Sequence, residues 1–187
     1  FDERGYLASE TEDGELEFYI VLVPPVEGNV PGLTPRLALK RPGDRIFMGP
    51  KVSGRYTLGA ITNPDLNVVF LSTGTGEAPH NSMIVELLRN GHKGKIVSAV
   101  SVRHWKDLGY LEQHRKLEEM FPNYSYMPMP TRESNVPKRY IQQTIESGEL
   151  EETLGAKLDP ENTHVYMCGN PSMIGAPEHV DGQDVFP

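Results

Sequence analysis

The sequence is poor in cysteine and has no long hydrophobic run. A single cysteine among 187 residues excludes an internal disulfide framework and fits a reducing compartment. No apolar run approaches the roughly 18–20 residues that a transmembrane helix needs, and nothing resembles a secretory signal, so we expect a cytoplasmic protein. The formal net charge of −8 argues against a nucleic-acid-binding protein, whose affinity comes largely from basic contacts to phosphates.

Lysine is missing where one class of phosphate site would need it. Residues 72–79 read STGTGEAP and stand between the apolar run 67–71 and a stretch that is typical of a helix. A nucleotide-hydrolase phosphate loop has Gly-x4-Gly-Lys followed by Ser or Thr. No lysine lies between Lys51 and Lys93, so this class is excluded.

The same turn matches the dinucleotide-binding fingerprint only in part. Gly74 and Gly76 begin Gly-x-Gly-x-x-Gly, but Pro79 replaces the third glycine, and no acidic residue ends the next strand to bind a ribose hydroxyl. What remains is a strand, a glycine turn and a helix whose first N–H groups suit a pyrophosphate. The hydroxyls of Thr73 and Thr75 could add hydrogen bonds. A tight turn that binds nothing is the alternative.

The first 62 residues are typical of β structure. Residues 16–23 are rich in β-branched and aromatic side chains and stop at two prolines, and 45–49 and 54–59 read as further short strands. Residues 36–40 are long enough for one or two helical turns. Short strands with glycine and proline between them predict a barrel or a sandwich.

After residue 62, strands alternate with helices. We expect buried strands at 67–71, 95–102, 124–129 and 164–169, and helices at 81–90, 107–121 and 138–150. This alternation predicts a parallel sheet with helices on both faces. The chain is therefore divided into domains at residues 1–62 and 63–187.

Two arginines follow the strands of this predicted sheet. The second strand ends at SVRH with Arg103, and the third ends near TRE with Arg132. Ligands of open parallel sheets sit outside the carboxyl ends of the strands, and the planar guanidinium group suits phosphate. An extra monophosphate, such as the 2′-phosphate of NADP, would explain these arginines. Surface arginines paired with Glu133 or Asp107 are the alternative.

Taken together, these segments resemble the ferredoxin–NADP reductases, specifically the bacterial flavodoxin/ferredoxin reductases. The matching segments occur in family order over nearly the whole chain: LEFYIVLV, GLTPRLALKRPGD, STGTGEAP, SVRHWKDLGYL, YMPMPTRES, IESGELEETLG and VYMCGNPSMI. The resemblance implies an antiparallel β-barrel that binds FAD, followed by an α/β domain that binds NADP(H). It also implies an enzyme that passes hydride between nicotinamide and flavin N5 and exchanges single electrons with ferredoxin or flavodoxin.

The resemblance also implies the residues of both cofactor sites. On the FAD side these are Arg4, Tyr6, Tyr19, Ile20, Val21, Leu33 and Thr34, with Thr75 at the flavin ring. On the NADP side they are the turn residues Thr73, Gly74, Thr75 and Gly76, then Val102, Arg103, Thr131, Arg132 and Arg139 toward the 2′-phosphate, and Cys168 and Gly169 near the nicotinamide. Arg139 stands one position before the residue that aligns with the family's second phosphate-binding arginine. Tyr6, stacked on the isoalloxazine, and Cys168 are the residues expected at the reacting rings.

The chain departs from the family pattern at both ends. The stretch RGYLAS has Arg4 and Tyr6 of the family's Arg-x-Tyr-Ser motif, but Leu7 stands where the serine belongs. The family has several strands before this motif and a final helix beyond the point where this chain stops, so we expect an incomplete reductase. A non-catalytic or flavin-free NADP-binding or electron-transfer adaptor module is therefore the alternative function. A related reductase with another acceptor is a third reading.

The remaining candidates for chemistry are weaker. Cys168 has no histidine–acid pair beside it, which favours a core thiol over a nucleophile. Three histidines lack metal-ligand spacing, so we predict no metal site: His80, His92 and His104. Five basic residues of the first domain either steer an acidic ferredoxin or are ordinary surface charge: Lys40, Arg41, Arg45, Lys51 and Arg55.

Overall fold

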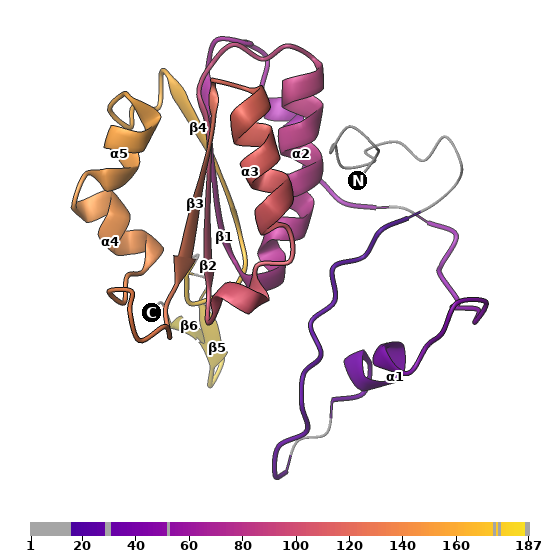
Figure 1. Cartoon of the computed structure of the whole chain (residues 1–187). Coiled ribbons are helices and arrows are strands. Elements are labelled where there is room, and N and C mark those ends of the chain that lie inside the picture. Colours follow the sequence, from indigo (N-terminus) through magenta and orange to yellow (C-terminus); the bar gives the residue numbers. More distant parts are fainter. Residues whose placement is uncertain (1–15, 29–30, 52, 174, 176, 186–187) are drawn as a thin grey trace.

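A four-stranded parallel sheet is the centre of the molecule. The computed structural model describes residues 16–28, 31–51, 53–173, 175 and 177–185. The strand order is β3-β2-β1-β4, and the strands are β1 (Asn67–Thr73), β2 (Ile96–Val102), β3 (Tyr124–Pro130) and β4 (Thr163–Cys168). One face is covered by α2 (Glu77–Arg89) and α3 (Leu111–Met120), the other by α4 (Ile141–Glu146) and α5 (Glu149–Leu154) (Figure 1). The predicted parallel sheet with helices on both faces is confirmed.

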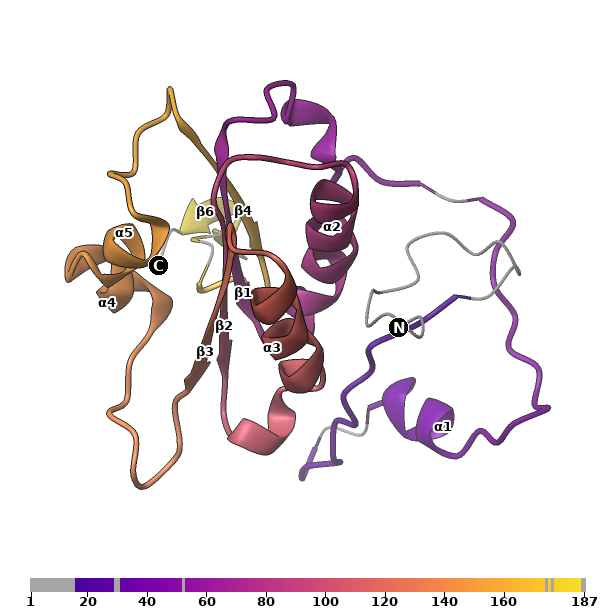
Figure 2. The same ribbon diagram turned by 45° about the horizontal axis from the view of Figure 1, so that its top comes forward.

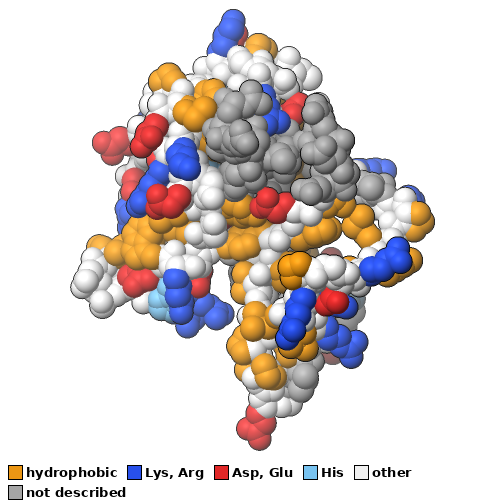
Figure 3. All heavy atoms as spheres, turned by 45° about the vertical axis from the view of Figure 1, so that its right-hand side comes forward, with side chains coloured by type: hydrophobic (Ala, Val, Ile, Leu, Met, Phe, Trp, Pro, Cys, Tyr) orange, Lys and Arg blue, Asp and Glu red, His pale blue; other side chains and the backbone are white. Residues whose placement is uncertain are grey.

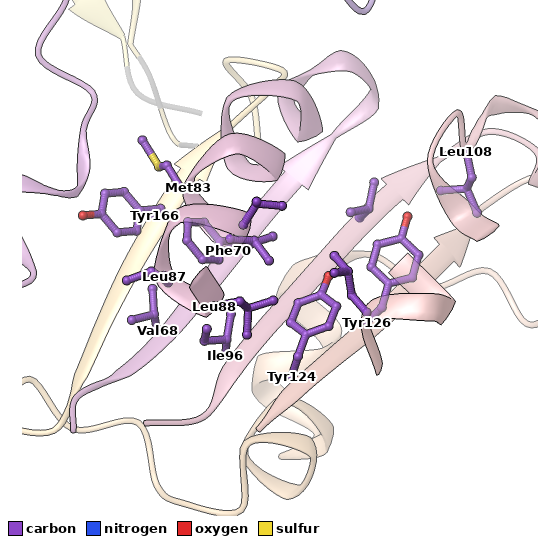
Figure 4. Packing of buried hydrophobic residues seen from close by; sticks show 14 of the residues in the cluster. Val68, Phe70, Met83, Leu87, Leu88, Ile96, Leu108, Tyr124, Tyr126 and Tyr166 are labelled. Carbon is purple, nitrogen blue, oxygen red and sulfur yellow. The ribbon is translucent and has the colours of Figure 1, made fainter. Parts of the chain in front are cut away.

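The core follows from the alternation of side chains along the buried strands. In β1, Val68 and Phe70 belong to a cluster with α2 and α3 (Figure 4), whereas Val69 and Leu71 pack toward α4 and α5. All seven residues of β2 are buried. This continuous burial holds the carboxyl ends of β1 and β2 in one fixed register.

All four predicted strands are present, but all three predicted helices differ in their bounds, and the one predicted at 107–121 begins only at Leu111. The helix predicted from residue 81 begins at Glu77, because Pro79 lies in its first turn, where a missing N–H costs nothing. The helix predicted at 138–150 is two short helices, α4 and α5, because Gly148 between them adopts φ 81°. Before α3, the chain forms a 3-10 turn, η3 (Trp105–Asp107).

A β-hairpin was not predicted near the end of the chain. It joins β5 (Glu178–Val180) to β6 (Gln183–Val185). Asp181 and Gly182 connect the strands with φ of 50° and 81°. An Asp-Gly pair with two positive φ angles is a strong hairpin signal, so this element was readable from the sequence.

The described N-terminal segment, from residue 16 to residue 62, does not form the predicted barrel. It contains α1 (Thr34–Ala38), as the RLALK stretch suggested, and a 3-10 turn, η1 (Leu58–Ala60), but no strand among its described residues. An extended chain gains strand hydrogen bonds and burial only beside a second strand, and 16–23, 45–49 and 54–57 are not paired here. Their apolar side chains are consequently exposed, up to 93% for Phe47.

The N-terminal segment nevertheless contacts the α/β part on the side of α2 and α3 (Figure 2). Tyr56 hydrogen-bonds through its hydroxyl to Nε2 of His80, at 2.7 Å. The hydroxyl of Tyr166 donates to the carbonyl of Thr57, at 3.1 Å. None of the described helices is long and apolar enough to cross a membrane. The domain boundary near residue 62 stays a prediction.

Protonation of His80 is expected to destabilise the fold in acid. Burial lowers the pKa of this side chain to about 4, whereas an exposed histidine titrates near 6.5. The unfolded chain therefore binds the extra proton first, so stability is lost as the pH falls from about 6.5 to about 4, by up to roughly 3 kcal/mol. Urea unfolding of wild type and of His80→Gln across this range measures the effect. The variant should show a shallower loss, and equal slopes would contradict the assignment.

Candidate functional site

The candidate site lies at the carboxyl edge of the sheet, between β1 and β4. From β1 the chain builds outward through β2 and β3 and then returns to the other side of β1. Ser72 is paired with Cys168 in the register of the two strands, so the turns that follow them lie side by side. This reversal of strand order is a topological switch point, the usual ligand site of open parallel sheets.

Two glycines allow these turns to touch. A Cβ on Gly76 would lie 2.1 Å from the carbonyl oxygen of Cys168, and a Cβ on Gly169 would lie 2.2 Å from Oγ1 of Thr73. The same Oγ1 accepts a hydrogen bond of 2.7 Å from the backbone N–H of Asn170. Both glycines are therefore required by backbone contact, and the two turns are fixed against each other.

The outer side of the first turn is open. Gly74 has φ 54° and no atom within 4 Å of its missing Cβ position, and the side chain of Thr75 is exposed. The turn leads into the 13 residues of α2, whose N-cap, Gly76, provides no side-chain hydrogen bond within the described structure. The N–H of Glu77 donates to the carbonyls of Gly74 and Thr75, and Pro79 has no N–H, so it is the positive end of the helix dipole that suits a phosphate group here.

Arg103 and Arg132 lie next to each other beyond β2 and β3. The N–H of Arg132 donates to the carbonyl of Arg103 at 2.8 Å, and the N–H of Thr131 donates to the carbonyl of Val102 at 2.9 Å. Both arginine side chains are exposed. The ion pairs among the described residues include neither arginine.

The acidic residues considered as partners of these arginines are engaged elsewhere. Glu133 accepts from the N–H of Trp105 at 2.8 Å and lies 3.5 Å from Nδ1 of His104. Asp107 accepts from the N–H of His104 at 3.0 Å. The two arginines are therefore available to an anionic ligand.

Arg139 has a different environment. Its guanidinium group forms an ion pair with Glu149, at the start of α5. A charge that is already paired within the protein has less to offer a phosphate, so this structure favours Arg103 and Arg132 over Arg139.

Cys168 ends β4 as a partly buried thiol. Burial raises the pKa of Cys168, which keeps the sulfur protonated and poorly nucleophilic. This agrees with a packing role at the switch point. Among the described residues, no group of three or more His, Cys, Asp or Glu side chains could hold a metal ion.

The predicted FAD residues are only partly brought together. Arg4 and Tyr6 lie outside the described residues. Oγ1 of Thr34 accepts from the N–H of Val23 at 3.1 Å, and Leu33 is 66% exposed. A cavity of about 140 Å³ beside them is lined by Ile20, Leu22, Thr34, Leu37 and Ala38. Val21 is exposed, and Tyr19 points to the loop before α3.

A buried polar network below the glycine turn was not predicted. Glu77, the first residue of α2, is fully buried. Its Oε1 accepts from the hydroxyl of Tyr126 at 2.9 Å and lies 3.0 Å from Nε2 of His114. Nδ1 of His114 is 2.7 Å from the hydroxyl of Tyr124. The His114 ring stacks on the ring of Tyr126, with centroids 4.1 Å apart. An acidic residue at a helix start usually faces solvent and the helix dipole. The sequence therefore gives no sign that Glu77 is buried against Tyr126 and His114.

Comparisons with known proteins agree with this geometry. Residues 70–179 match the family model of the oxidoreductase NAD-binding domain. The flavodoxin/ferredoxin–NADP reductase of Escherichia coli (strain K12) is 33% identical over 178 residues, which cover 92% of this chain and 68% of that protein. Ferredoxin–NADP reductase A of Sorangium cellulosum (strain So ce56) is 31% identical over 91% of this chain and 63% of that protein.

A solved structure shares the fold. The crystal structure of a ferredoxin NADP+ reductase from Neisseria gonorrhoeae, with bound FAD and NADP, superimposes with a TM-score of 0.56 at 24% identity. The match covers 69% of this chain and 56% of the other. The chain thus spans between about half and two thirds of the length of these proteins.

Proposed function

Because this chain belongs to the ferredoxin–NADP reductase family, we propose that it is an FAD-dependent oxidoreductase that exchanges electrons between NADPH and ferredoxin or flavodoxin. The observation that carries the proposal is the pair of touching glycine turns at the switch point between β1 and β4. They leave an open backbone surface at the start of α2, where a dinucleotide pyrophosphate can approach the positive end of the helix closely.

The NADP residues have distinct tasks in this proposal. The turn from Thr73 to Gly76 holds the pyrophosphate, and Arg103 and Arg132 bind the 2′-phosphate with two guanidinium groups. Val102 and Thr131 hold these arginines together through their backbone hydrogen bond. Cys168 and Gly169 line the nicotinamide end, where the neutral thiol adds contact without competing chemistry.

The FAD residues belong to the N-terminal segment. When bound, FAD supplies the chemistry that divides a two-electron donor into single-electron steps. Thr34 accepts a backbone hydrogen bond and therefore still has a hydroxyl proton to donate to a phosphate oxygen. The apolar residues that line the cavity beside it suit the uncharged edge of a nucleotide. Arg4 and Tyr6 complete the proposed site.

The electron partner would meet the N-terminal segment. Basic and hydrophobic side chains lie together on its surface (Figure 3). Five basic residues belong to it: Lys40, Arg41, Arg45, Lys51 and Arg55. Such a surface attracts an acidic partner over several ångströms and then offers apolar contact.

The visible absorption spectrum tests the proposed function. Protein that is incubated with FAD and then freed of unbound cofactor should show an oxidised flavin spectrum that bleaches when NADPH is added without oxygen, because both cofactor sites are then occupied and in register. A colourless protein that still binds NADPH would contradict the proposal and support the flavin-free module instead.

The choice of NADPH over NADH is tested at the two arginines. Replacing both Arg103 and Arg132 by alanine should weaken NADPH binding by at least about 100-fold, since each charged hydrogen bond contributes roughly 1.5–3 kcal/mol. NADH binding should be largely spared, because NADH lacks the 2′-phosphate. Titration calorimetry measures both affinities, and Arg115→Ala, at an exposed arginine of α3, serves as the control. Equal losses for the two nucleotides would refute the assignment.

A further inference from the structure

The loop between β2 and α3, residues 103–110, is held rigidly. Asp107, the last residue of η3, accepts from the N–H of His104 at 3.0 Å and thereby caps the start of this turn. Leu108 is buried in the core cluster, and Trp105 donates to Glu133 from the neighbouring loop at 2.8 Å. The loop therefore offers a fixed surface to the N-terminal segment, and Arg103 keeps its place when that segment moves.

The hydroxyl of Tyr19, from the N-terminal segment, both donates and accepts a hydrogen bond at this loop. It donates to the carbonyl of Asp107 at 2.6 Å and accepts from the N–H of Gly109 at 3.3 Å. Its ring meets Tyr110 edge-on, with centroids 5.2 Å apart. Burial raises the pKa of Tyr19, so the hydroxyl remains protonated and able to donate.

The lack of a side chain at Gly109 leaves room for the Tyr19 ring. A Cβ at this position would lie 3.1 Å from Cε2 and 3.2 Å from Cζ of Tyr19, so the ring rests on bare backbone. Gly109 is not among the glycines with positive φ, which means that its backbone would accept alanine. The absence of a side chain at this position therefore serves the fit of the Tyr19 ring.

The contact joins the two halves of the proposed enzyme. Residues 103–110 begin with Arg103, proposed to hold the 2′-phosphate, and end at Gly109 and Tyr110, which hold Tyr19. Tyr19, Ile20 and Val21 are consecutive residues of the extended stretch expected to run along the flavin, and the side chain of Tyr19 points to Asp107 and Gly109 instead. One rigid loop thus connects nucleotide binding with the approach of the flavin segment.

We propose that Tyr19 is a positioning residue, which docks the flavin-bearing segment on residues 107–110 and thereby sets the alignment of the two cofactors. This inference rests on the proposed function. Because hydride transfer depends steeply on alignment, and a shift of about 1 Å can cost about 100-fold in rate, loss of the contact should slow the reaction without weakening nucleotide binding.

Two variants and one control test this role in the full chain. Tyr19→Phe keeps the ring and removes both hydrogen bonds, and Gly109→Ala pushes the ring while keeping both partners. Tyr56→Phe is the matched control, because it also removes a tyrosine hydroxyl bond between the N-terminal segment and the α/β part. Hydrogen exchange at the Gly109 amide reports docking, and stopped-flow flavin reduction separates the rate from the dissociation constant of NADPH.

We expect both Tyr19→Phe and Gly109→Ala to lower the reduction rate about tenfold, with the NADPH dissociation constant changed less than twofold. The Gly109 amide should exchange about tenfold faster in Tyr19→Phe, and Tyr56→Phe should change neither quantity. A wild-type reduction rate in Tyr19→Phe, or an NADPH affinity that falls with the rate, would overturn the positioning role.

The two proposals can fail separately. If flavin binds but NADPH does not reduce it in wild type, the proposed function fails, and the effect of Tyr19 on rate fails with it. The docking contact is then tested by hydrogen exchange at the Gly109 amide alone. Equal exchange rates at this amide in wild type and Tyr19→Phe would overturn the docking contact as well.

Discussion

Replacing Glu77 by alanine is expected to destabilise the protein by about 1–3 kcal/mol, because it removes the buried acceptor of the Tyr126 hydroxyl and leaves that hydroxyl unsatisfied. The change leaves Nε2 of His114 and the hydroxyl of Tyr126 without the oxygen that they contact at 3.0 Å and 2.9 Å. Neither group can reach water, since His114 is 1% exposed and Tyr126 is 7% exposed. Urea unfolding, followed by far-UV circular dichroism, measures the free energy of unfolding.

A carboxylate on the surface of the protein provides the control. Glu112 and Arg115 lie 2.9 Å apart on the surface of α3, with side chains 71% and 55% exposed. Exposed pairs contribute about 0–1 kcal/mol, so Glu112→Ala should hardly change stability. Glu77→Gln should fall between the two, because its amide oxygen can still accept one hydrogen bond. A loss in Glu77→Ala no larger than in Glu112→Ala would show that the buried network does not stabilise the fold.

The α/β part could be predicted from the sequence because its signals are local and consistent. Buried parallel strands appear as short continuous apolar runs, and the glycine turn stands between such a run and a helix. The proximity of Arg103 and Arg132 could be predicted because the carboxyl ends of parallel strands lie at one edge of the sheet. Their pairing through backbone hydrogen bonds agrees with that expectation.

The N-terminal segment shows the limit of such signals. Residues 16–23 have the composition of a β-strand. Composition indicates that these residues suit a sheet, but a strand also needs a neighbouring strand to pair with. The contacts that do form depend on single tyrosine hydroxyls, Tyr19 to Asp107 and Tyr56 to His80. These partners are 88 and 24 residues apart, a separation that no local pattern encodes.

The buried network was missed for a related reason. Glu77 stands inside the recognised glycine motif, yet its partners come from α3 and β3, and a helix-start acid is ordinarily a surface residue. Only the packing of α2 against both elements encloses the carboxylate. The position of Glu77 directly after the turn means that this network also supports the shape of the proposed phosphate site.

Replacing Gly76 by alanine is expected to abolish most nucleotide binding. The new Cβ would stand 2.1 Å from the carbonyl oxygen of Cys168, a contact that requires the two backbones to separate. Gly76 itself has φ −60°, so alanine causes no backbone strain, and the whole effect comes from separating the turns after β1 and β4. Displacement of the turn should weaken NADPH binding by about 100-fold, as measured by titration calorimetry. Overpacking should also cost about 1–3 kcal/mol of stability.

Gly94→Ala separates these two effects, because it creates the same kind of clash at the opposite edge of the sheet. Its Cβ would lie 2.0 Å from the carbonyl oxygen of Leu66, just before β1 and β2 begin. Like Gly76, Gly94 is not among the positive-φ glycines, so the two variants should lose similar stability. Only Gly76→Ala should lose NADPH affinity, measured where both variants are fully folded. An equal loss of affinity in Gly94→Ala would mean that general destabilisation, and not the contact between the two turns, controls nucleotide binding.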